Sequence, residues 1–322
     1  MKAIVHHKYG SPDVLEIAEV EKPVCMEDEV LVRVRAASVN PSQWYAMMGL
    51  FIGRMQMGWL KPKDPRLGSD FAGVVEAVGT SVMDFKKGDE VYGGRSGAFA
   101  EYISVSKGVG LKPVNLTFEE AAAVPTAALT ALQGLRDHGH LQPGQKVLIN
   151  GAAGGVGTFA VQIAKVFGAH VTGVCSTRNV ELVRSLGADQ VIDYTKEDFT
   201  RNGQRYDLFF DVAGSRSWSE CKRILTPNAT FVIVGGPKTN RIIGPLSHVL
   251  QIRLASMRAS QKAVFFVASF KCEDLEALKT LIESGKVKPV VDRVYPMSQT
   301  AEAMRYLGTG HAPGKIVVTM EK

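Results

Sequence analysis

The stretch Asn150-Gly-Ala-Ala-Gly-Gly-Val-Gly157 decides the fold. It directly follows KVLIN (residues 146–150), an apolar run typical of a strand. It directly precedes a helical pattern over residues 158–167, which ends at a glycine. A glycine-rich turn between a strand and a helix is typical of a nucleotide-binding βα unit.

The spacing within this stretch fits the dinucleotide fingerprint G-x-G-x-x-G. Ala152, Gly154 and Gly157 fill its three positions, with Gly155 and Val156 between the last two. Such a turn lets the backbone approach a pyrophosphate, and the helix N-terminus offers unpaired N–H groups to its charge. The spacing therefore predicts a dinucleotide site; a purely structural turn is the alternative.

The pattern of strand and helix continues toward the C-terminus. Near-continuous apolar runs that alternate with helices predict a parallel sheet covered on both faces, which is a doubly wound Rossmann α/β domain. The further predicted strands are residues 170–175, 190–193, 207–212, 230–235 and 262–270, with a helix over 180–186.

The first 110 residues follow a different pattern. Short segments with period-two alternation and glycine turns predict an irregular, antiparallel β-rich domain. Its expected strands are residues 4–5, 29–36, 71–78 and 90–92, and two more near the C-terminus are 290–294 and 315–320. Thr117 with Glu120 predicts a capped helix start, an alanine-rich helical stretch then runs to His138, and a further helix is expected over 273–284.

Composition sets the broad class. A chain of 322 residues is expected to form two domains, and 45% hydrophobic with 22% charged residues indicates a globular protein. We expect no signal peptide, because the start MKAIVHHKYG has no apolar stretch of sufficient length. We expect no membrane segment, because the longest uncharged run, residues 147–164, contains four glycines. The expected location is therefore cytoplasmic. Four widely spaced cysteines predict neither a disulfide framework nor a metal site.

The net charge of +6 is concentrated in one segment. Residues 221–272 contain eight Lys or Arg and no Asp or Glu. Such a segment attracts nucleic acid, an anionic cofactor or a phosphorylated substrate, or it is simply a solvated face. Because aromatic residues are not interleaved as on a single-strand binding face, we do not expect nucleic acid as a partner.

The residues after the second predicted strand of the α/β series indicate which dinucleotide binds. An NAD site usually places a carboxylate there, about 20 residues after the glycines. This chain has Ser176, Thr177 and Arg178 instead. Hydroxyls and a guanidinium suit a 2′-phosphate, so NADP(H) is the expected cofactor; a surface arginine at a helix start is the alternative.

These motifs together resemble a known family. GAAGGVG, LGSDFAGVVEAVG (67–79) and AAAVPTAALTAL (121–132) are similar to segments of the medium-chain dehydrogenase/reductase superfamily, nearest to its zinc-free quinone oxidoreductase-like branch. The resemblance implies a GroES-like β-rich domain, residues 1–119 with 265–322, and a Rossmann domain, residues 120–264. Zinc-dependent members carry metal ligands at Ala37–Asn40, at Gly68–Asp70 and in a four-Cys lobe near residues 90–110. This chain lacks those ligands, so no metal is expected.

The resemblance also implies site residues. Tyr194 matches a tyrosine beside the 2′-phosphate, and Lys315 falls in a C-terminal Gly-Lys element. The lysine that relatives carry after the second strand falls on Asn179, a departure for which Arg178 is the expected substitute. Positions that match residues lining the nicotinamide are Thr130, Gly235, Gly236, Pro237, Phe266, Val267 and Ala268.

The activity implied by the resemblance is NADPH-dependent reduction of quinones, or of C=C bonds conjugated to a carbonyl in enones, 2-alkenals or enoyl thioesters. The expected site lies in the cleft between the domains. Tyr45 is the candidate proton donor and Asn40 the candidate orienting or polarising group; packing and an Asx turn are their structural alternatives. The Met-rich stretch 47–59 is expected either as core or as the wall of an acceptor site.

Two further expectations complete the sequence-based account. By resemblance, the protein forms a homodimer through its last Rossmann strand. The competing function is an NADPH-binding protein with little turnover, acting as a redox sensor, a structural module or a nucleic-acid-binding module.

Overall fold

The computed structural model describes residues 1–236 and 246–320. The chain divides into two compact units. Unit 1 comprises Met1–Leu129, Ser269–Gly285 and Pro289–Lys322, and unit 2 comprises Thr130–Ala268 with Lys286–Lys288. The division falls within one helix, α4 (Pro125–Gln133).

Unit 2 is built on a parallel sheet of six strands among the described residues, in the order β10–β9–β8–β11–β12–β13. The two strands at the centre of this order, β8 and β11, are the first and fourth along the chain, which is the strand order of a Rossmann fold. This confirms the predicted fold class. The strands are β8 (Lys146–Asn150), β9 (His170–Cys175), β10 (Gln190–Asp193), β11 (Tyr206–Asp211), β12 (Leu225–Ile233) and β13 (Lys262–Phe265).

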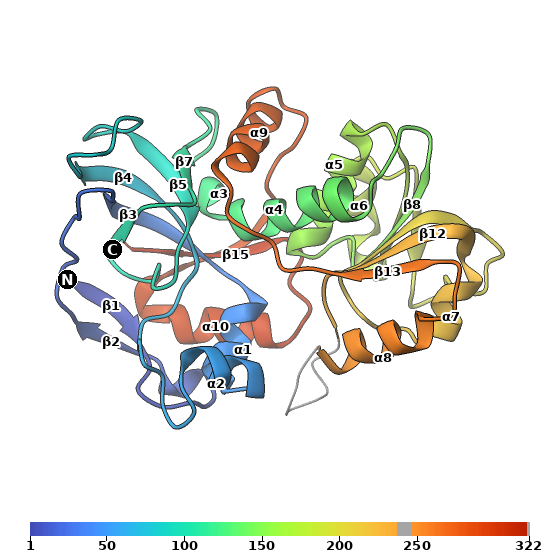
Figure 1. The fold of residues 1–322 in the computed structure, drawn as a ribbon, viewed down its shortest axis with the longest axis horizontal. Coiled ribbons are helices and arrows are strands. Elements are labelled where there is room, and N and C mark those ends of the chain that lie inside the picture. Colours follow the sequence, from blue (N-terminus) through green and yellow to red (C-terminus); the bar gives the residue numbers. More distant parts are fainter. Residues whose placement is uncertain (237–245, 321–322) are drawn as a thin grey trace. The chain divides into compact units, whose positions relative to one another are not determined.

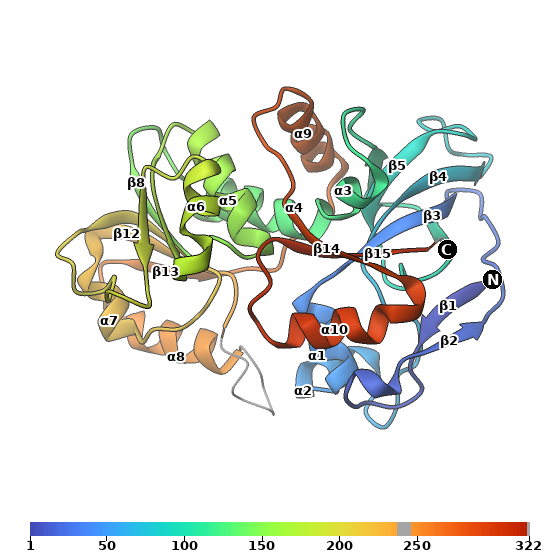
Figure 2. The same ribbon diagram turned by 180° about the vertical axis from the view of Figure 1, so that it is seen from behind.

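Helices cover both faces of this sheet, as the apolar strands require. Figures 1 and 2 show α5 (Gly155–Val166) and α6 (Val180–Ser185) on one face, and α7 (Trp218–Arg223) and α8 (Leu246–Ser256) on the other. The core on the second side is aromatic. Phe209 stacks on Phe231 with ring centroids 4.8 Å apart, and Trp218 of α7 stacks on Phe231 at 6.2 Å.

Unit 1 contains a mostly antiparallel sheet of seven strands within the described residues. The strand order is β14–β15–β3–β4–β5–β7, and β6 also pairs with β3; a separate hairpin joins β1 and β2. These strands are β1 (Lys2–Val5), β2 (Glu16–Glu19), β3 (Val30–Val39), β4 (Asp70–Val78), β5 (Glu90–Gly94), β6 (Tyr102–Val105), β7 (Val109–Leu111), β14 (Val291–Pro296) and β15 (Lys315–Thr319). Its helices are α1 (Pro41–Met48), α2 (Phe51–Met57), α3 (Phe118–Ala122), α9 (Cys272–Glu283) and α10 (Thr300–Gly308).

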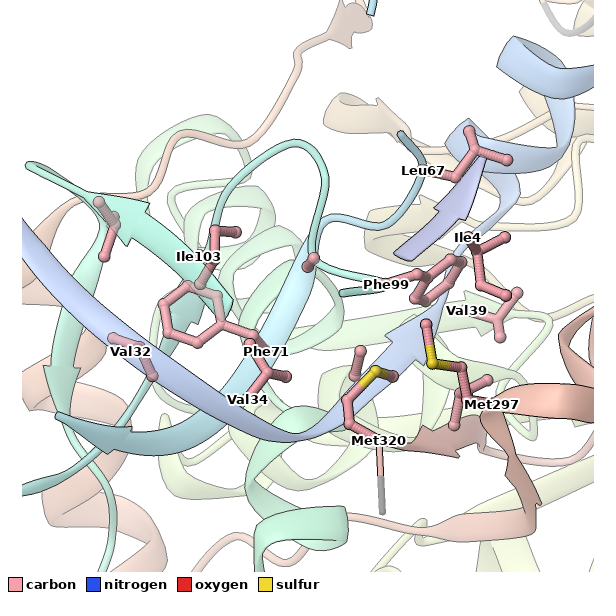
Figure 3. Packing of buried hydrophobic residues seen from close by; sticks show 14 of the residues in the cluster. Ile4, Val32, Val34, Val39, Leu67, Phe71, Phe99, Ile103, Met297 and Met320 are labelled. Atoms are coloured by element: carbon pink, nitrogen blue, oxygen red, sulfur yellow. The ribbon is translucent and has the colours of Figure 1, made fainter. Parts of the chain in front are cut away.

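The apolar side chains of β3 and β4 form the centre of the unit 1 core. Figure 3 shows Val32 and Val34 of β3 close to Phe71 of β4, all of them buried. Arg33, between the two valines, points to solvent and is exposed, as period-two alternation requires. The alternation ends farther along, where residues 36–39 of β3 and 70–73 of β4 are buried on both faces of the sheet.

The predicted helix between Thr117 and His138 is interrupted. The capping box at its start is confirmed, because the Glu120 amide donates to Thr117 Oγ1 at 3.2 Å and the Thr117 amide to the Glu120 carboxylate at 3.0 Å. The helix then stops before Pro125, which begins α4. Proline has no N–H to continue the hydrogen-bond ladder, so a continuous helix was the wrong prediction here.

The last predicted strand of the α/β series, residues 262–270, is also too long. β13 ends at Phe265, because the next ring leaves the sheet: Phe266 stacks on His138 at a centroid distance of 4.3 Å. Further on, Phe270 lies against Gly94 and Gly108 of unit 1, where an added Cβ would overlap its ring. The aromatic residues after β13 thus pack in two separate places, Phe266 against His138 in unit 2 and Phe270 against the glycines of unit 1.

The Met-rich stretch 47–59 forms the end of α1 and the whole of α2, neither of which was predicted as a helix. It is divided between the two expected environments. Met47 is fully buried in the unit 1 core, whereas Met55 and Trp59 are exposed. None of the described helices is long and apolar enough to cross a membrane.

Candidate active and cofactor site

The carboxyl ends of the unit 2 strands lie along one edge of the sheet. In register, Asp193 is opposite Cys175, Asn150 is opposite Asp211, and Asp211 is opposite Ile233. The predicted cofactor residues of this unit follow those ends. They are the turn 151–157 after β8, Ser176 and Arg178 after β9, Tyr194 after β10, Gly235 and Gly236 after β12, and Phe266, Val267 and Ala268 after β13.

The glycines of the turn differ in what they must accommodate. Gly151 has a φ of +83°, a conformation that favours glycine. A Cβ on Gly157 would lie 2.1 Å from the Gly151 carbonyl oxygen, so that glycine is needed for the turn itself. A Cβ on Gly154 would meet one protein atom within 4 Å, the same oxygen at 3.4 Å. The position that a Cβ of Gly154 would take, at the N-terminus of α5, is therefore open to a ligand.

A buried hydrogen-bonded pair lies beneath the turn, where β8 and β11 are neighbours. The Asn150 amide donates to Asp211 Oδ1 at 2.8 Å, and the backbone N–H of Gly214 donates to the same oxygen at 2.9 Å. Asp211 is fully buried. Sequence analysis missed this pair; its signal was a polar residue at the end of each of two apolar strands.

The loop expected to hold a 2′-phosphate is fastened from the neighbouring strand. Asp193 at the end of β10 accepts from Thr177 Oγ1 at 2.6 Å, and from the backbone N–H and Oγ1 of Thr195 at 3.0 and 2.7 Å. Thr177 lies between Ser176 and Arg178 in the sequence. Its hydroxyl bond to Asp193 therefore holds the loop that carries these two residues. The sequence predicted Tyr194 at this place but gave no role to its neighbour Asp193, because the pairing of this strand end with the loop is not visible in the sequence.

The hydrogen bonds to Asp193 predict an acid-dependent loss of stability. The hydrogen bond from Thr177, with those from Thr195, lowers the pKa of Asp193 from 3.8 to about 2. The ionised carboxylate therefore stabilises the fold above about pH 4, and this contribution is lost as the pH falls toward 2. We expect Asp193→Asn to lower the midpoint of thermal unfolding at pH 7 and to reduce the fall of that midpoint between pH 4 and pH 2.

Circular dichroism at a series of pH values measures both effects, with the exposed Asp28→Asn as the control. If Asp193→Asn kept the full wild-type fall between pH 4 and pH 2, the account of this loop would be wrong.

The residues at this edge fit a dinucleotide phosphate. A pyrophosphate fits the open space beside Gly154, where the N–H groups at the start of the 12-residue helix α5 can donate to it. A 2′-phosphate fits the exposed guanidinium of Arg178. Tyr194 is exposed by 48%, beside this loop. Val267, by contrast, is 82% exposed, and Thr130 is half-buried on α4. Pro237 lies outside the described residues.

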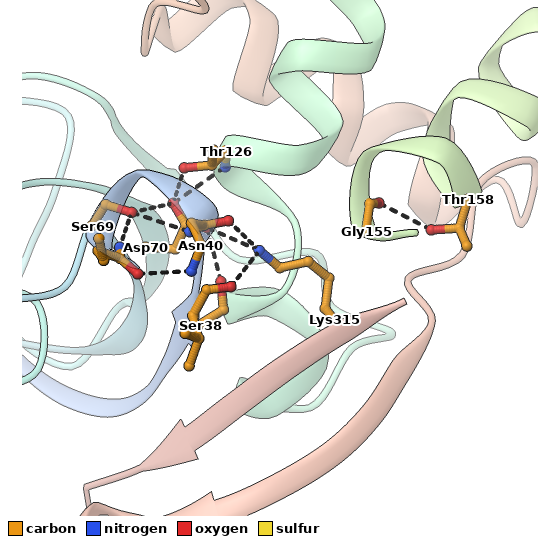
Figure 4. Close-up of polar contacts among 10 residues, drawn as sticks. Ser38, Asn40, Ser69, Asp70, Thr126, Gly155, Thr158 and Lys315 are labelled. Carbon is orange, nitrogen blue, oxygen red and sulfur yellow. Dashed lines mark hydrogen bonds and ion pairs between the residues drawn. The ribbon is translucent and has the colours of Figure 1, made fainter. Parts of the chain in front are cut away.

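Unit 1 contains a buried polar cluster around Asp70, which includes two of the predicted site residues, Asn40 and Lys315 (Figure 4). Asp70 begins β4 and is fully buried. Its Oδ2 accepts from Ser38 Oγ and from Asn40 Nδ2, each at 2.8 Å, and its Oδ1 accepts from the Thr126 hydroxyl and, at 3.2 Å, from the Thr126 backbone N–H. Of these residues Asn40 was predicted from the sequence as a site residue, whereas Ser38 and Asp70 fall in segments that were considered only as lacking zinc ligands.

Asn40 uses all the hydrogen-bonding groups of its amide within this cluster. Its Nδ2 donates to Asp70 and, at 3.1 Å, to Ser69 Oγ, and its Oδ1 accepts from the ammonium of Lys315. Its backbone N–H donates to Gln43 Oε1 at 2.7 Å, which closes the first turn of α1. The side chain is 3% exposed.

Lys315, predicted at the cofactor, is buried inside unit 1. Its Nζ lies 3.6 Å from Asp70 Oδ2 and 3.4 Å from the Val39 carbonyl oxygen, in addition to the bond to Asn40. Burial lowers the pKa of Lys315, and the charge of Asp70 opposes that shift. The geometry thus makes Lys315 the counter-ion of Asp70.

Tyr45 lies on α1, five residues after Asn40, and is half-buried. Burial raises the pKa of its phenol above the ordinary tyrosine value, because desolvation disfavours the phenolate. The phenol hydroxyl makes no hydrogen bond to the residues that the structure describes. The described residues therefore leave this O–H group without a hydrogen-bond acceptor.

Metal ligands do not gather in the described part of the chain. No group of three or more His, Cys, Asp or Glu side chains there is placed to hold a metal ion. At Ser69 and Asp70, where the sequence analysis placed family metal ligands, the oxygen atoms accept from protein donors, Lys315 among them.

Comparison with known proteins agrees with both units. Residues 26–132 match the family model "Alcohol dehydrogenase GroES-like domain", and residues 186–318 match "Zinc-binding dehydrogenase". A 2-methylene-furan-3-one reductase of Solanum lycopersicum and the NADPH-dependent alkenal/one oxidoreductase of Arabidopsis thaliana are each 38% identical to the chain, over 99% of its length and 79% of theirs.

A solved structure extends this likeness over the whole chain. The quinone oxidoreductase from Coxiella burnetii is 30% identical, with a TM-score of 0.87 over 100% of this chain and 99% of that one. The chain therefore belongs to the medium-chain dehydrogenase/reductase superfamily, in its quinone oxidoreductase-like branch. The predicted resemblance is confirmed.

Proposed function

We propose that this protein is an NADPH-dependent reductase of quinones or of C=C bonds conjugated to a carbonyl. The observation that carries the proposal is the open glycine turn at the start of α5, next to a loop that presents Arg178. The relatives support the same class, since one is named an NADPH-dependent alkenal/one oxidoreductase and another a quinone oxidoreductase. The predicted enzyme class and cofactor, an oxidoreductase that uses NADP(H), agree with them.

The reaction adds one hydride and one proton to the acceptor. NADPH held at the glycine turn and Arg178 would supply the hydride for a new C–H bond at the β-carbon of an enone. The C=C π pair would shift to form the C=C bond of an enolate, and the C=O π pair would move onto the carbonyl oxygen. A proton then bonds to the α-carbon, giving the saturated carbonyl compound and NADP⁺. With a quinone, the same hydride and proton give the hydroquinone.

The chain supplies the proton and the fixed geometry. We assign the proton to the phenol of Tyr45, a half-buried hydroxyl on α1 that makes no hydrogen bond to the described residues. Asn40 takes the orienting role of the two predicted for it, because its amide groups are already bonded to Asp70, Ser69 and Lys315.

We further propose that the reaction is independent of zinc. An ion at the position of Ser69 and Asp70 would have to displace the Lys315 ammonium and would meet few oxygen lone pairs that are not already used. The unoccupied phenol of Tyr45 offers a proton without a metal-bound group.

NADPH preference is expected to depend on Arg178. Arg178→Ala removes a charge-assisted contact to the 2′-phosphate, so kcat/KM for NADPH is expected to fall about 10- to 100-fold. The value for NADH, which lacks that phosphate, is expected to change less than about twofold. Arg184→Ala on α6, which removes an exposed guanidinium paired with Glu181, is the control. Equal losses for both cofactors would show that Arg178 does not read the phosphate.

Oxidation of NADPH and NADH with a 1,4-quinone, a 2-alkenal, a cyclic enone and an enoyl thioester, each with and without a chelator, tests the proposed function. We expect turnover that is faster with NADPH and unaffected by the chelator. Tight NADPH binding without turnover would favour the non-catalytic alternative, and turnover abolished by the chelator would contradict zinc independence.

The homodimer remains part of the proposal. β13 is the last strand of the unit 2 sheet, and none of the described strands pairs with its outer edge. An uncovered edge of this kind favours pairing with another strand. Light scattering coupled to size-exclusion chromatography distinguishes a dimer from a monomer.

A further inference from the structure

The carboxylate of Asp70 contacts the first residues of two helices. Through Oδ2 it bonds Asn40, the residue that caps α1, and through Oδ1 it bonds Thr126, the second residue of α4. Figure 4 shows Asp70 between these two residues, with the Lys315 side chain directed toward Asn40. A single side chain therefore fastens the starts of two helices.

Each of these helices carries one residue of the proposed function. α1 carries Tyr45, five residues after Asn40. α4 carries Thr130, one helical turn after Thr126 and therefore on the same helix face. A displacement at either helix start moves the corresponding residue, because a helix of eight or nine residues shifts as one body.

The charge of the pair argues against a purely structural purpose. Asp70 is fully buried and Lys315 is 3% exposed, and within the described residues each is the other's ionic partner. Burying two charges costs desolvation, and well-packed apolar residues commonly give equal or higher stability. Unlike an apolar group, a carboxylate accepts several hydrogen bonds in fixed directions. Here the donors are Ser38, Asn40 and Thr126.

We propose that Asp70, neutralised by Lys315, is a positioning residue that holds Tyr45 and Thr130 in place through the starts of α1 and α4. The inference rests on the proposed function for the roles of those two residues. In this proposal Lys315 is the counter-ion of Asp70 and not the cofactor contact that was predicted from the sequence.

The variant Asp70→Asn tests this assignment. An amide has an acceptor on one side and an NH2 group on the other, while the Asn40 amide nitrogen and the Thr126 backbone N–H can only donate. The variant keeps its size but must therefore lose one of these two bonds, and with it the charge-assisted anchoring of one helix start. We expect either kcat to fall about tenfold, when the α1 side is lost, or the Kd of NADPH to rise about tenfold, when the α4 side is lost. The matched control is Asp89→Asn, which removes a carboxylate that accepts from the Lys86 backbone N–H in another turn of unit 1.

A second variant covers the case in which Asp70→Asn leaves a buried lysine unpaired and unfolds. Asp70→Asn with Lys315→Met removes both charges, so we expect its thermal midpoint to exceed that of Lys315→Met alone while the kcat or Kd defect persists. If Asp70 had only a structural role, a variant with a restored thermal midpoint would also regain its kcat and Kd. A restored midpoint with a persisting kcat or Kd defect therefore supports the positioning role.

NADPH Kd, measured by the change in its fluorescence on binding, needs no acceptor and so is informative even if the proposed reaction fails. A double variant with wild-type kcat and wild-type Kd would overturn the positioning role, as would equal defects in Asp89→Asn. An absence of turnover in the wild-type protein would contradict the proposed function, while the Kd comparison would still decide the role of Asp70.

Discussion

Tyr45→Phe is expected to lower kcat with a 2-alkenal by about 100-fold, the lower range of what a positioned general acid contributes. The change removes one oxygen atom from a half-buried side chain and keeps the ring in place. The phenol of a tyrosine is protonated at neutral pH, and burial raises the pKa of this one further. The Kd of NADPH is expected to stay unchanged, since the ring is retained.

Steady-state kinetics with saturating NADPH measure the effect. Tyr102→Phe on β6, which alters another half-buried tyrosine of unit 1, is the matched control. A Tyr45→Phe protein with kcat within about twofold of the wild type would transfer the role of proton donor to water or to another residue.

The same substitution is expected to lower stability at Gly157 and to lower NADPH affinity at Gly154. Gly157→Ala places a methyl group 2.1 Å from the Gly151 carbonyl oxygen and 2.8 Å from two backbone atoms of Ala152. The turn must open, and we expect a loss of about 3 kcal/mol. For a unit of this size such a loss corresponds to a thermal midpoint lower by about 10 °C.

Gly154→Ala adds the same methyl group where one protein atom lies at 3.4 Å. The fold is expected to be unchanged, while the methyl group occupies the space assigned to the pyrophosphate and raises the Kd of NADPH about tenfold or more. Thermal unfolding and NADPH fluorescence on both proteins separate the two effects. A stable Gly154→Ala protein with wild-type NADPH affinity would show that the cofactor does not approach this turn.

The α/β half of the fold could be predicted because its signals are local. Strands such as KVLIN are continuous apolar runs, and each glycine or turn residue stands directly at an element's end. The β-rich half was harder to predict, because α1 and α2 carry apolar residues that face both core and solvent. Pro125 and Phe266 show the same limit, since the end of an element there depends on a proline and on a distant ring.

The site could be predicted where function requires a backbone shape, and less well where it depends on contacts between distant segments. The turn 150–157 could be identified from spacing. The partners of Asp70 lie 30, 32 and 56 residues away in the sequence, at Asn40, Ser38 and Thr126. No local pattern joins them; the polar residues at the ends of β3 and β4 were the available signal.

The most direct test of the central claim is the fate of a labelled hydride. NADPH carrying deuterium at C4 of the nicotinamide is oxidised with a cyclic enone in ordinary water, and the product is analysed by NMR. Our account predicts a saturated ketone with deuterium at the β-carbon and hydrogen from solvent at the α-carbon. Deuterium at the carbonyl carbon of an alcohol, or a labelled cofactor that stays unoxidised with every acceptor, would contradict it.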